Sequence, residues 1–99
     1  MIRPIRTVRP AAEELVDAVG WYERQRPGLG GEFFDAIRRT VDRISETPEA
    51  GPSWGQVDGR RILVAGFPYQ IVYRIGADGI RIPAFAQLKR RPGFWRHRR

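Results

Sequence analysis

The chain has 99 residues, a formal net charge of +7, no cysteine and one histidine. The lack of cysteine excludes disulfides, cysteine zinc ligands and cysteine nucleophiles, and one histidine excludes a multi-histidine metal site within one chain. With 41% hydrophobic and 11% aromatic residues, the sequence is too apolar for a disordered basic tail, so we expect one folded domain over residues 1–99.

The first half of the chain predicts a short strand followed by a helix. Residues 2–8 have the character of a strand, and Pro4 favours an edge position or the strand start because it cannot donate a ladder hydrogen bond. Pro10 is suited to the first turn of the helix that follows. The apolar residues of this helix recur at spacings of three and four and predict one buried stripe: Leu15, Val16, Val19 and Tyr22. Its acidic residues are expected on the solvated side: Glu13, Glu14, Asp17 and Glu23.

The glycine-rich segment 27–31 predicts a turn between two helices. It is not a phosphate loop, because no strand precedes it and no Gly-Lys-Ser/Thr follows it. The second helix should begin near Gly31 and end before Pro48. Its predicted buried stripe consists of Phe33 or Phe34, Ile37, Val41 and Ile44. Two such stripes joined by a short link indicate an antiparallel helical hairpin.

The second half of the chain predicts a sheet. After a loop over residues 48–59, three apolar runs occupy residues 61–65, 69–75 and 80–88. With Asp78 and Gly79 as the turn, the last two runs form a hairpin with these facing pairs: Ile75 with Ile82, Tyr73 with Ala84, and Ile71 with Ala86. The other face would then carry Gln70, Val72, Arg74, Arg81, Phe85 and Gln87. The predicted fold is α+β, in the order β-α-α-β-β-β, with a helical hairpin packed on one face of an antiparallel sheet.

The positive charge lies in the second half of the chain. Residues 1–50 carry eight arginines and nine acidic residues, whereas residues 51–99 carry ten cations and two acidic residues. This excess indicates a polyanionic or acidic partner, and the alternative is an arginine-rich composition on a solvated surface. No apolar stretch approaches the ~20 residues of a membrane span, and residues 1–10 lack a signal-peptide core. We therefore expect a cytoplasmic protein without a membrane partner.

The basic tail, residues 89–99, interleaves cations with Phe94 and Trp95. Arginine provides forked phosphate contacts and aromatic rings provide stacking surfaces, so this composition is typical of RNA or single-strand binding. The alternative is that Phe94 and Trp95 pack the tail onto the sheet while the arginines between them are solvated. The two interpretations are compatible.

Several short motifs occur in a recognisable order. The helical half contains Pro10, then Trp21-Tyr22-Glu23, Pro27-Gly28-Leu29-Gly30 and Glu32-Phe33, and Ile44 with Pro48. The sheet half contains Arg61-Ile62-Leu63, Phe67-Pro68-Tyr69, Ile71 and Tyr73-Arg74-Ile75, followed by Arg90, Pro92 and Trp95. In this order and spacing, nearly the whole chain resembles the RelE/ParE superfamily of bacterial toxins, in the branch called plasmid stabilisation proteins.

The resemblance implies a toxin of a type II toxin–antitoxin pair, with two helices packed on an antiparallel sheet. It implies a cognate antitoxin, often acidic in its C-terminal segment, which neutralises the toxin and through which the pair reaches operator DNA. We expect no cofactor and no metal. The acidic antitoxin segment is a fitting partner for the basic half of the chain.

Two toxic mechanisms occur in the superfamily. ParE-like members inhibit DNA gyrase by binding, and RelE-like members cleave mRNA in the ribosomal A site. Gln87 stands where many relatives carry histidine, and Phe94 stands where tyrosine is common. Neither side chain can transfer a proton at neutral pH. The sequence therefore favours non-enzymatic, ParE-like inhibition. The alternatives are a ribosome-dependent mRNA interferase and a degenerate toxin that retains only antitoxin and operator binding.

The resemblance and the basic-aromatic composition together give the candidate residues. If the protein is a nuclease, the cations expected to hold phosphate are Arg61, Arg74, Arg81, Lys89 and Arg90, although arginine is a poor general base. The predicted binding surface comprises Gln70, Arg74, Arg81, Phe85, Gln87, Lys89, Arg90, Arg91, Phe94, Trp95 and Arg96.

Overall fold

The computed structural model describes residues 4–54, 57–91 and 93–98. Along the chain its elements are β1 (Ile5–Thr7), α1 (Arg9–Gln25), α2 (Leu29–Glu46), a 3-10 turn (Pro48–Ala50), β2 (Ser53–Trp54), β3 (Val57–Leu63), β4 (Tyr69–Gly76) and β5 (Gly79–Gln87). The five strands form one sheet in the order β1-β5-β4-β3-β2. The predicted α+β class and helical hairpin are confirmed. The short strand β2 lies in the segment that the sequence analysis assigned to a loop.

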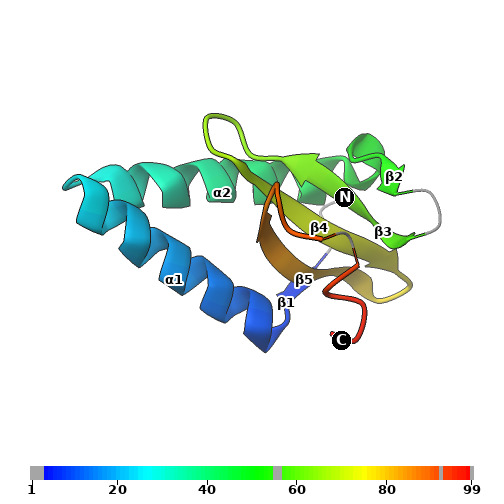
Figure 1. Ribbon diagram of the computed structural model, residues 1–99. Coiled ribbons are helices and arrows are strands. Elements are labelled where there is room, and N and C mark those ends of the chain that lie inside the picture. Colours follow the sequence, from blue (N-terminus) through cyan, green and yellow to red (C-terminus); the bar gives the residue numbers. More distant parts are fainter. Residues whose placement is uncertain (1–3, 55–56, 92, 99) are drawn as a thin grey trace.

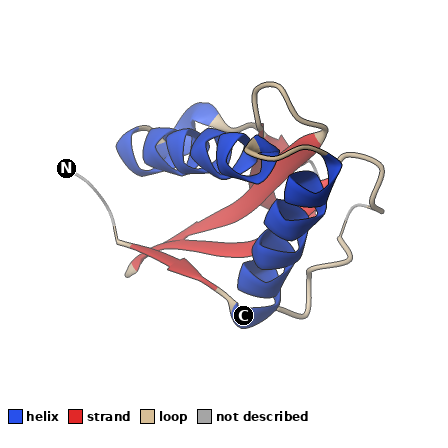
Figure 2. Cartoon of the chain, turned by 90° about the vertical axis from the view of Figure 1, so that its left-hand side faces the viewer, coloured by secondary structure: helices blue, strands red, loops and turns tan. Residues whose placement is uncertain are grey.

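The first strand lies at the sheet edge, as Pro4 indicated. It pairs with β5 in parallel, whereas all other strand pairs are antiparallel. Figure 1 shows α2 behind the sheet and the chain after β5 in front of it. The two helices meet at residues 26–28 and diverge from there (Figures 1 and 2). In the described part of the chain, no helix is both long and apolar enough to cross a membrane.

The helices bury largely the predicted stripes. In α2, Phe33 is fully buried and Phe34 is exposed, so the apolar face runs from Phe33. In α1, the sequence prediction was wrong for Val16, which is 70% exposed. Alanine takes that space on α1, because Ala11 and Ala18 lie in the core and allow the helix to approach β5 closely.

The turn between the helices is held by a side chain that the sequence analysis placed in solvent. The Glu23 carboxylate accepts hydrogen bonds from the backbone N–H of Gly28 at 3.0 Å and of Gly30 at 3.0 Å. These donors lie at the start of α2, where the helix leaves N–H groups unpaired and its dipole favours negative charge. Gly28 has a φ of 91°, a conformation that favours glycine. Glu23 therefore fixes the geometry of the hairpin.

The register of the β4–β5 hairpin differs from the prediction. Gly76 pairs with Gly79 across a turn formed by Ala77 and Asp78, and Ile75 pairs with Ile80, not with Ile82. Farther along, Ile71 pairs with Phe85 and Val72 with Ala84, so Tyr73 faces both Ile82 and Pro83. This β-bulge has a physical cause: a proline inside a central strand cannot donate to the ladder and is accommodated where pairing is interrupted.

The bulge exchanges the two faces of β5. Ile80 and Ile82 pack in the core under the helices, and after the bulge Phe85 does so as well. Ala84, predicted for the helix-covered face, packs instead with Val72 and Trp95 on the opposite face. We call this second face, which the helices do not cover, the outer face. The predicted grouping of Phe85 and Gln87 with Gln70, Arg74 and Arg81 is therefore wrong.

The Tyr73 hydroxyl joins the sheet to the end of α2. It donates to the carbonyl of Pro48 at 2.5 Å and accepts from the N–H of Gly51 at 2.9 Å. Burial raises the pKa of the Tyr73 phenol, against a smaller lowering by the Gly51 hydrogen bond and by nearby arginines. Burial also raises the pKa of Tyr22, with Tyr69 adding to the effect.

These pKa directions predict a loss of stability in alkali. Unfolded tyrosines ionise near pH ~10 while the folded phenols keep their protons, so the free energy of unfolding should fall as the pH rises above about 10. Tyr73→Phe should cost about 1–3 kcal/mol at neutral pH, because Pro48 and Gly51 lose their partner, and should reduce the alkaline fall. Urea unfolding of both proteins across this pH range measures the effect. Equal alkaline slopes would contradict the role given to Tyr73.

Candidate functional site

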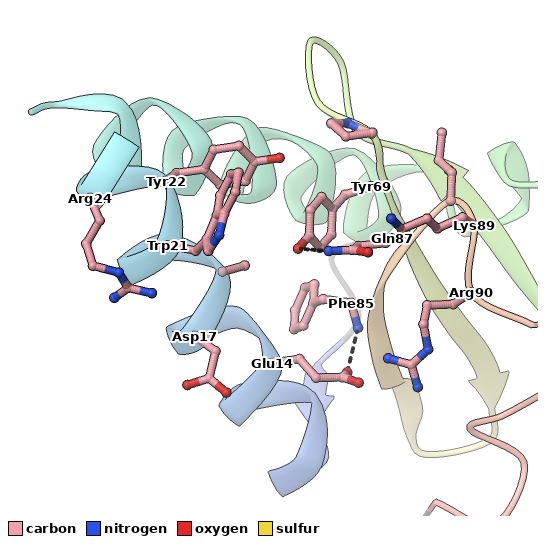
Figure 3. A pocket seen from close by; sticks show the side chains of 13 residues that line it. Glu14, Asp17, Trp21, Tyr22, Arg24, Tyr69, Phe85, Gln87, Lys89 and Arg90 are labelled. Carbon is pink, nitrogen blue, oxygen red and sulfur yellow. Dashed lines mark hydrogen bonds between the residues drawn. The ribbon is translucent and has the colours of Figure 1, made fainter. Parts of the chain in front are cut away.

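A groove of about 740 Å³ lies between α1 and the end of β5 (Figure 3). One wall comes from α1 and includes Glu14, Asp17 and Trp21. The opposite wall comes from the start of β4 and the residue before it, the end of β5 and the segment that follows β5. Its residues are Pro68, Tyr69, Phe85, Gln87, Leu88, Lys89 and Arg90. We call this feature the α1–β5 groove.

The groove is open because β1 is short. In the described structure, β1 pairs with β5 through Thr7 and Ile82 and no farther, so the following stretch of β5 has no strand on that side. The Glu14 carboxylate occupies this edge and accepts a hydrogen bond from the Phe85 N–H at 3.3 Å. The same oxygen lies 2.9 Å from the Arg98 guanidinium in an ion pair that is largely buried. Glu14, expected on the solvated side, instead joins α1, β5 and the tail.

Aromatic rings line the inner end of the groove. Tyr22 packs against Phe33, Phe67 and Tyr69, with ring centroids 4.7, 5.1 and 6.2 Å apart. Two further lining residues are exposed to solvent: Trp21 is 52% exposed and Leu88 is 46% exposed. The groove thus presents an apolar surface beside the cations Arg24, Lys89 and Arg90.

The position with most bearing on proton transfer is Gln87. Its amide nitrogen lies 3.4 Å from the Tyr69 hydroxyl, and the two residues are paired across β5 and β4 (Figure 3). An amide can donate and accept hydrogen bonds but cannot take a proton at neutral pH. Among the residues that the structure describes, no group of three histidine, aspartate or glutamate side chains could hold a metal ion.

The tail packs on the outer face of the sheet. Trp95 has no exposed surface and rests against Val72 and Ala84. The Arg74 guanidinium lies 5.2 Å from the Trp95 ring centroid and donates to the carbonyls of Arg98 and Arg96. Of the two sequence interpretations of this aromatic residue, packing of the tail onto the sheet describes its position.

Phe94 lies between two guanidinium groups of the same region. The Arg90 guanidinium carbon is 3.8 Å from the ring centroid, and that of Arg98 is 5.1 Å away. Phe94 is half-buried, while Arg91 and Arg96 are exposed. The basic tail therefore contains a stacked segment with cations at its surface.

The other predicted site residues divide between the two faces of the sheet. Gln70 is only 2% exposed, and its amide oxygen lies 3.5 Å from the Arg61 guanidinium. Arg61 pairs with Val72, and Arg74 pairs with Arg81, which places these three arginines on the outer face. Lys89 and Arg90 line the α1–β5 groove instead. The structure therefore does not bring the five predicted phosphate-holding cations together at one place.

A family model, the ParE toxin of the type II toxin-antitoxin system parDE, matches residues 5–92. The chain belongs to the ParE toxin family. It is therefore a type II toxin of the RelE/ParE kind, as the motifs implied, and its family implies an antitoxin partner. No curated protein matches the chain significantly.

Two examples illustrate the similarity of this toxin to solved structures. One is the chromosomal ParDE TA system from P. aeruginosa, with a TM-score of 0.74, 18% identity, and coverage of 87% of this chain and 96% of that chain. The other is a mutant of the E. coli toxin RelE in the free state, with a TM-score of 0.66, 16% identity, and coverage of 90% and 86%. At these identities, the similarity concerns the fold.

Several groove residues of the ParE-family toxin were absent from the sequence prediction. Trp21 and Tyr69 belong to motifs that carry the resemblance, but neither was among the predicted site residues. A signal for Trp21 was available: it is next to Tyr22 of the predicted apolar stripe and does not fit that stripe itself, so a large apolar side chain faces outward. Glu14 gave no such signal, because its partners Phe85 and Arg98 are more than 70 residues away in the sequence.

Proposed function

We propose that this toxin acts in the cytoplasm by binding its target, as a non-enzymatic, ParE-like inhibitor of DNA gyrase. The observation that carries the proposal is the separation of the cations: Arg61, Arg74 and Arg81 lie on the outer face, and Lys89 and Arg90 line the groove. RNA cleavage needs charge stabilisation and proton transfer at one phosphate. Gln87, at the position of interest in the groove, provides no proton transfer.

The same geometry supports a site for the antitoxin. Exposed Trp21 and Leu88 supply apolar anchors, and Arg24, Lys89 and Arg90 supply positive charge beside them. Aromatic anchors at the centre of a contact carry much of the binding energy of protein interfaces, and surrounding charge complementarity adds specificity. A partner segment with apolar and acidic residues fits these features, so we place the antitoxin in the α1–β5 groove.

Two assays with the purified toxin test the mechanism. We expect inhibition in a gyrase supercoiling assay, relieved by prior addition of the antitoxin, and no cleavage of A-site mRNA on programmed ribosomes. Arg90→Ala should weaken inhibition more than Arg38→Ala, which removes an equal charge from the exposed side of α2. Clean A-site cleavage would overturn the proposal in favour of an mRNA interferase. Inactivity in both assays with tight antitoxin binding would identify a degenerate toxin.

A further inference from the structure

Three arginines stand side by side across neighbouring strands on the outer face. Arg6 of β1 is in register with Arg81 of β5, and Arg81 is in register with Arg74 of β4. Neighbouring strands are about 4.8 Å apart, so the set spans roughly 10 Å at the backbone. We call these three residues the arginine ladder. Like charges directly opposite one another destabilise a sheet, so cross-strand pairing does not explain why three arginines lie in register.

The arginine ladder borders a hollow of about 630 Å³ at the β4–β5 turn. The turn residues along it are small, namely Gly76, Ala77 and Gly79. Arg6 and Arg81 are exposed beside them, whereas Arg74 is half-buried. Among the described residues that line the hollow, Asp78 in the exposed turn is the single acidic one. The hollow therefore carries a clear excess of positive charge.

One member of the ladder is held in place before any ligand arrives. The Arg74 guanidinium donates to the carbonyl of Arg98 at 3.1 Å and to that of Arg96 at 3.4 Å, and it lies over the buried Trp95 ring. Arg81, its neighbour, is exposed. A cation that is already ordered loses little conformational entropy on binding, which favours contact with a fixed array of negative charges.

We propose that the arginine ladder binds the phosphate backbone of duplex DNA. Guanidinium forks match phosphate oxygens, and a row of cations about 10 Å long can contact more than one phosphate. The contact would be independent of base sequence. It goes beyond the proposed inhibitor function and differs from the expectation that the toxin reaches operator DNA only through its antitoxin.

Other polyanions fit the ladder less well. Single strands are normally bound by aromatic stacking platforms, but the exposed aromatic side chains of the described residues, Trp21 and Phe34, lie on the helices, and Trp95 is buried. An acidic protein segment would be expected to use apolar anchors as well as charge, and these lie in the α1–β5 groove. The ladder offers charge without either feature, which is what a duplex backbone requires.

Salt-dependent binding to duplex DNA tests the proposal. The full chain is titrated against a fluorescein-labelled duplex of ~20 base pairs and arbitrary sequence, with anisotropy as the readout, between ~50 and ~200 mM salt. Loss of one phosphate contact in Arg81→Ala should reduce the magnitude of the slope of log K against log salt by about 0.9. Between these two salt concentrations, the variant should therefore lose about 3.5-fold less affinity than the unchanged protein loses. Arg6→Ala should behave like Arg81→Ala, and Arg81→Lys should retain most of the slope.

Arg38→Ala is the matched control, because it removes one exposed arginine from α2 and leaves the ladder intact. Its slope should equal that of the unchanged protein, and thermal melting should show that all variants are folded. The proposal is overturned if Arg81→Ala and Arg38→Ala change the slope equally. It is also overturned if a single strand of the same length binds more tightly than the duplex, or if polyglutamate displaces the duplex at a lower charge concentration than unlabelled duplex does.

Discussion

Replacing Trp95 with alanine is expected to lower the free energy of unfolding by about 3–5 kcal/mol. The indole is fully buried against Val72 and Ala84, and the Arg74 guanidinium lies over its ring, 5.2 Å from the ring centroid. Removal leaves a cavity on the outer face that a strand cannot fill, because backbone pairing holds β4 and β5 in place. Urea unfolding monitored by circular dichroism measures the change.

Trp21, an exposed tryptophan on α1, provides the matched control. Trp21 is 52% exposed, and its ring lies edge-on to that of Tyr22 with the centroids 5.1 Å apart. Trp21→Ala should therefore lower the free energy of unfolding by no more than about 1.5 kcal/mol. Comparable stabilities for Trp95→Ala and Trp21→Ala would show that the tail does not form part of the fold.

The same Trp21→Ala variant is expected to weaken antitoxin binding by about 30-fold or more. Truncation of an aromatic hot spot commonly costs about 2 kcal/mol or more, and this side chain is the largest exposed apolar group of the α1–β5 groove. The effect should appear mainly in the dissociation rate, because interface mutations act there. Calorimetry and surface binding kinetics with the cognate antitoxin give both quantities.

Phe34→Ala is the control for this prediction. Phe34 is 46% exposed on α2 and does not line the groove. It should leave antitoxin affinity within a few-fold of the unchanged protein, whereas Leu88→Ala should weaken binding in the same direction as Trp21→Ala. If Phe34→Ala has the larger effect, the antitoxin occupies a different surface.

The helices could be predicted because their signals are local. A three-and-four spacing of apolar residues and a Pro-Gly link define the hairpin within about 40 residues of sequence. There is one exception: Val16 fits the apolar stripe by type, yet it is exposed, and the residues of α1 that are buried are Ala11 and Ala18. The spacing identified an amphipathic helix but not the side chains that a close helix–strand contact requires.

The strand register could not be obtained from alternation alone. Alternation assumes a continuous strand, and Pro83 interrupts β5 where Tyr73 faces two residues. Pro83 was visible in the sequence, and a proline inside a predicted central strand is a recognised sign of a bulge. A predicted bulge at Pro83 would have placed Phe85 on the helix-covered face, among the residues that line the groove.

The candidate site depended on contacts that are distant in the sequence. The basic-aromatic composition of residues 89–96 drew attention to the tail, but composition does not distinguish a buried tryptophan from an exposed one. The division of the cations between two faces follows from strand register and from the position of α1. Neither is encoded locally, which is why the predicted set combined residues that the structure separates.

The carboxylate of Glu14 has a further consequence for how copies of the toxin behave together. An edge strand with free backbone donors is a template for pairing with another chain, and many proteins protect such edges with a charged side chain. Glu14 occupies the Phe85 N–H on the open side of β5 and is itself held by Arg98. The oxygen that anchors the tail thus also guards the sheet against edge-to-edge self-association and aggregation.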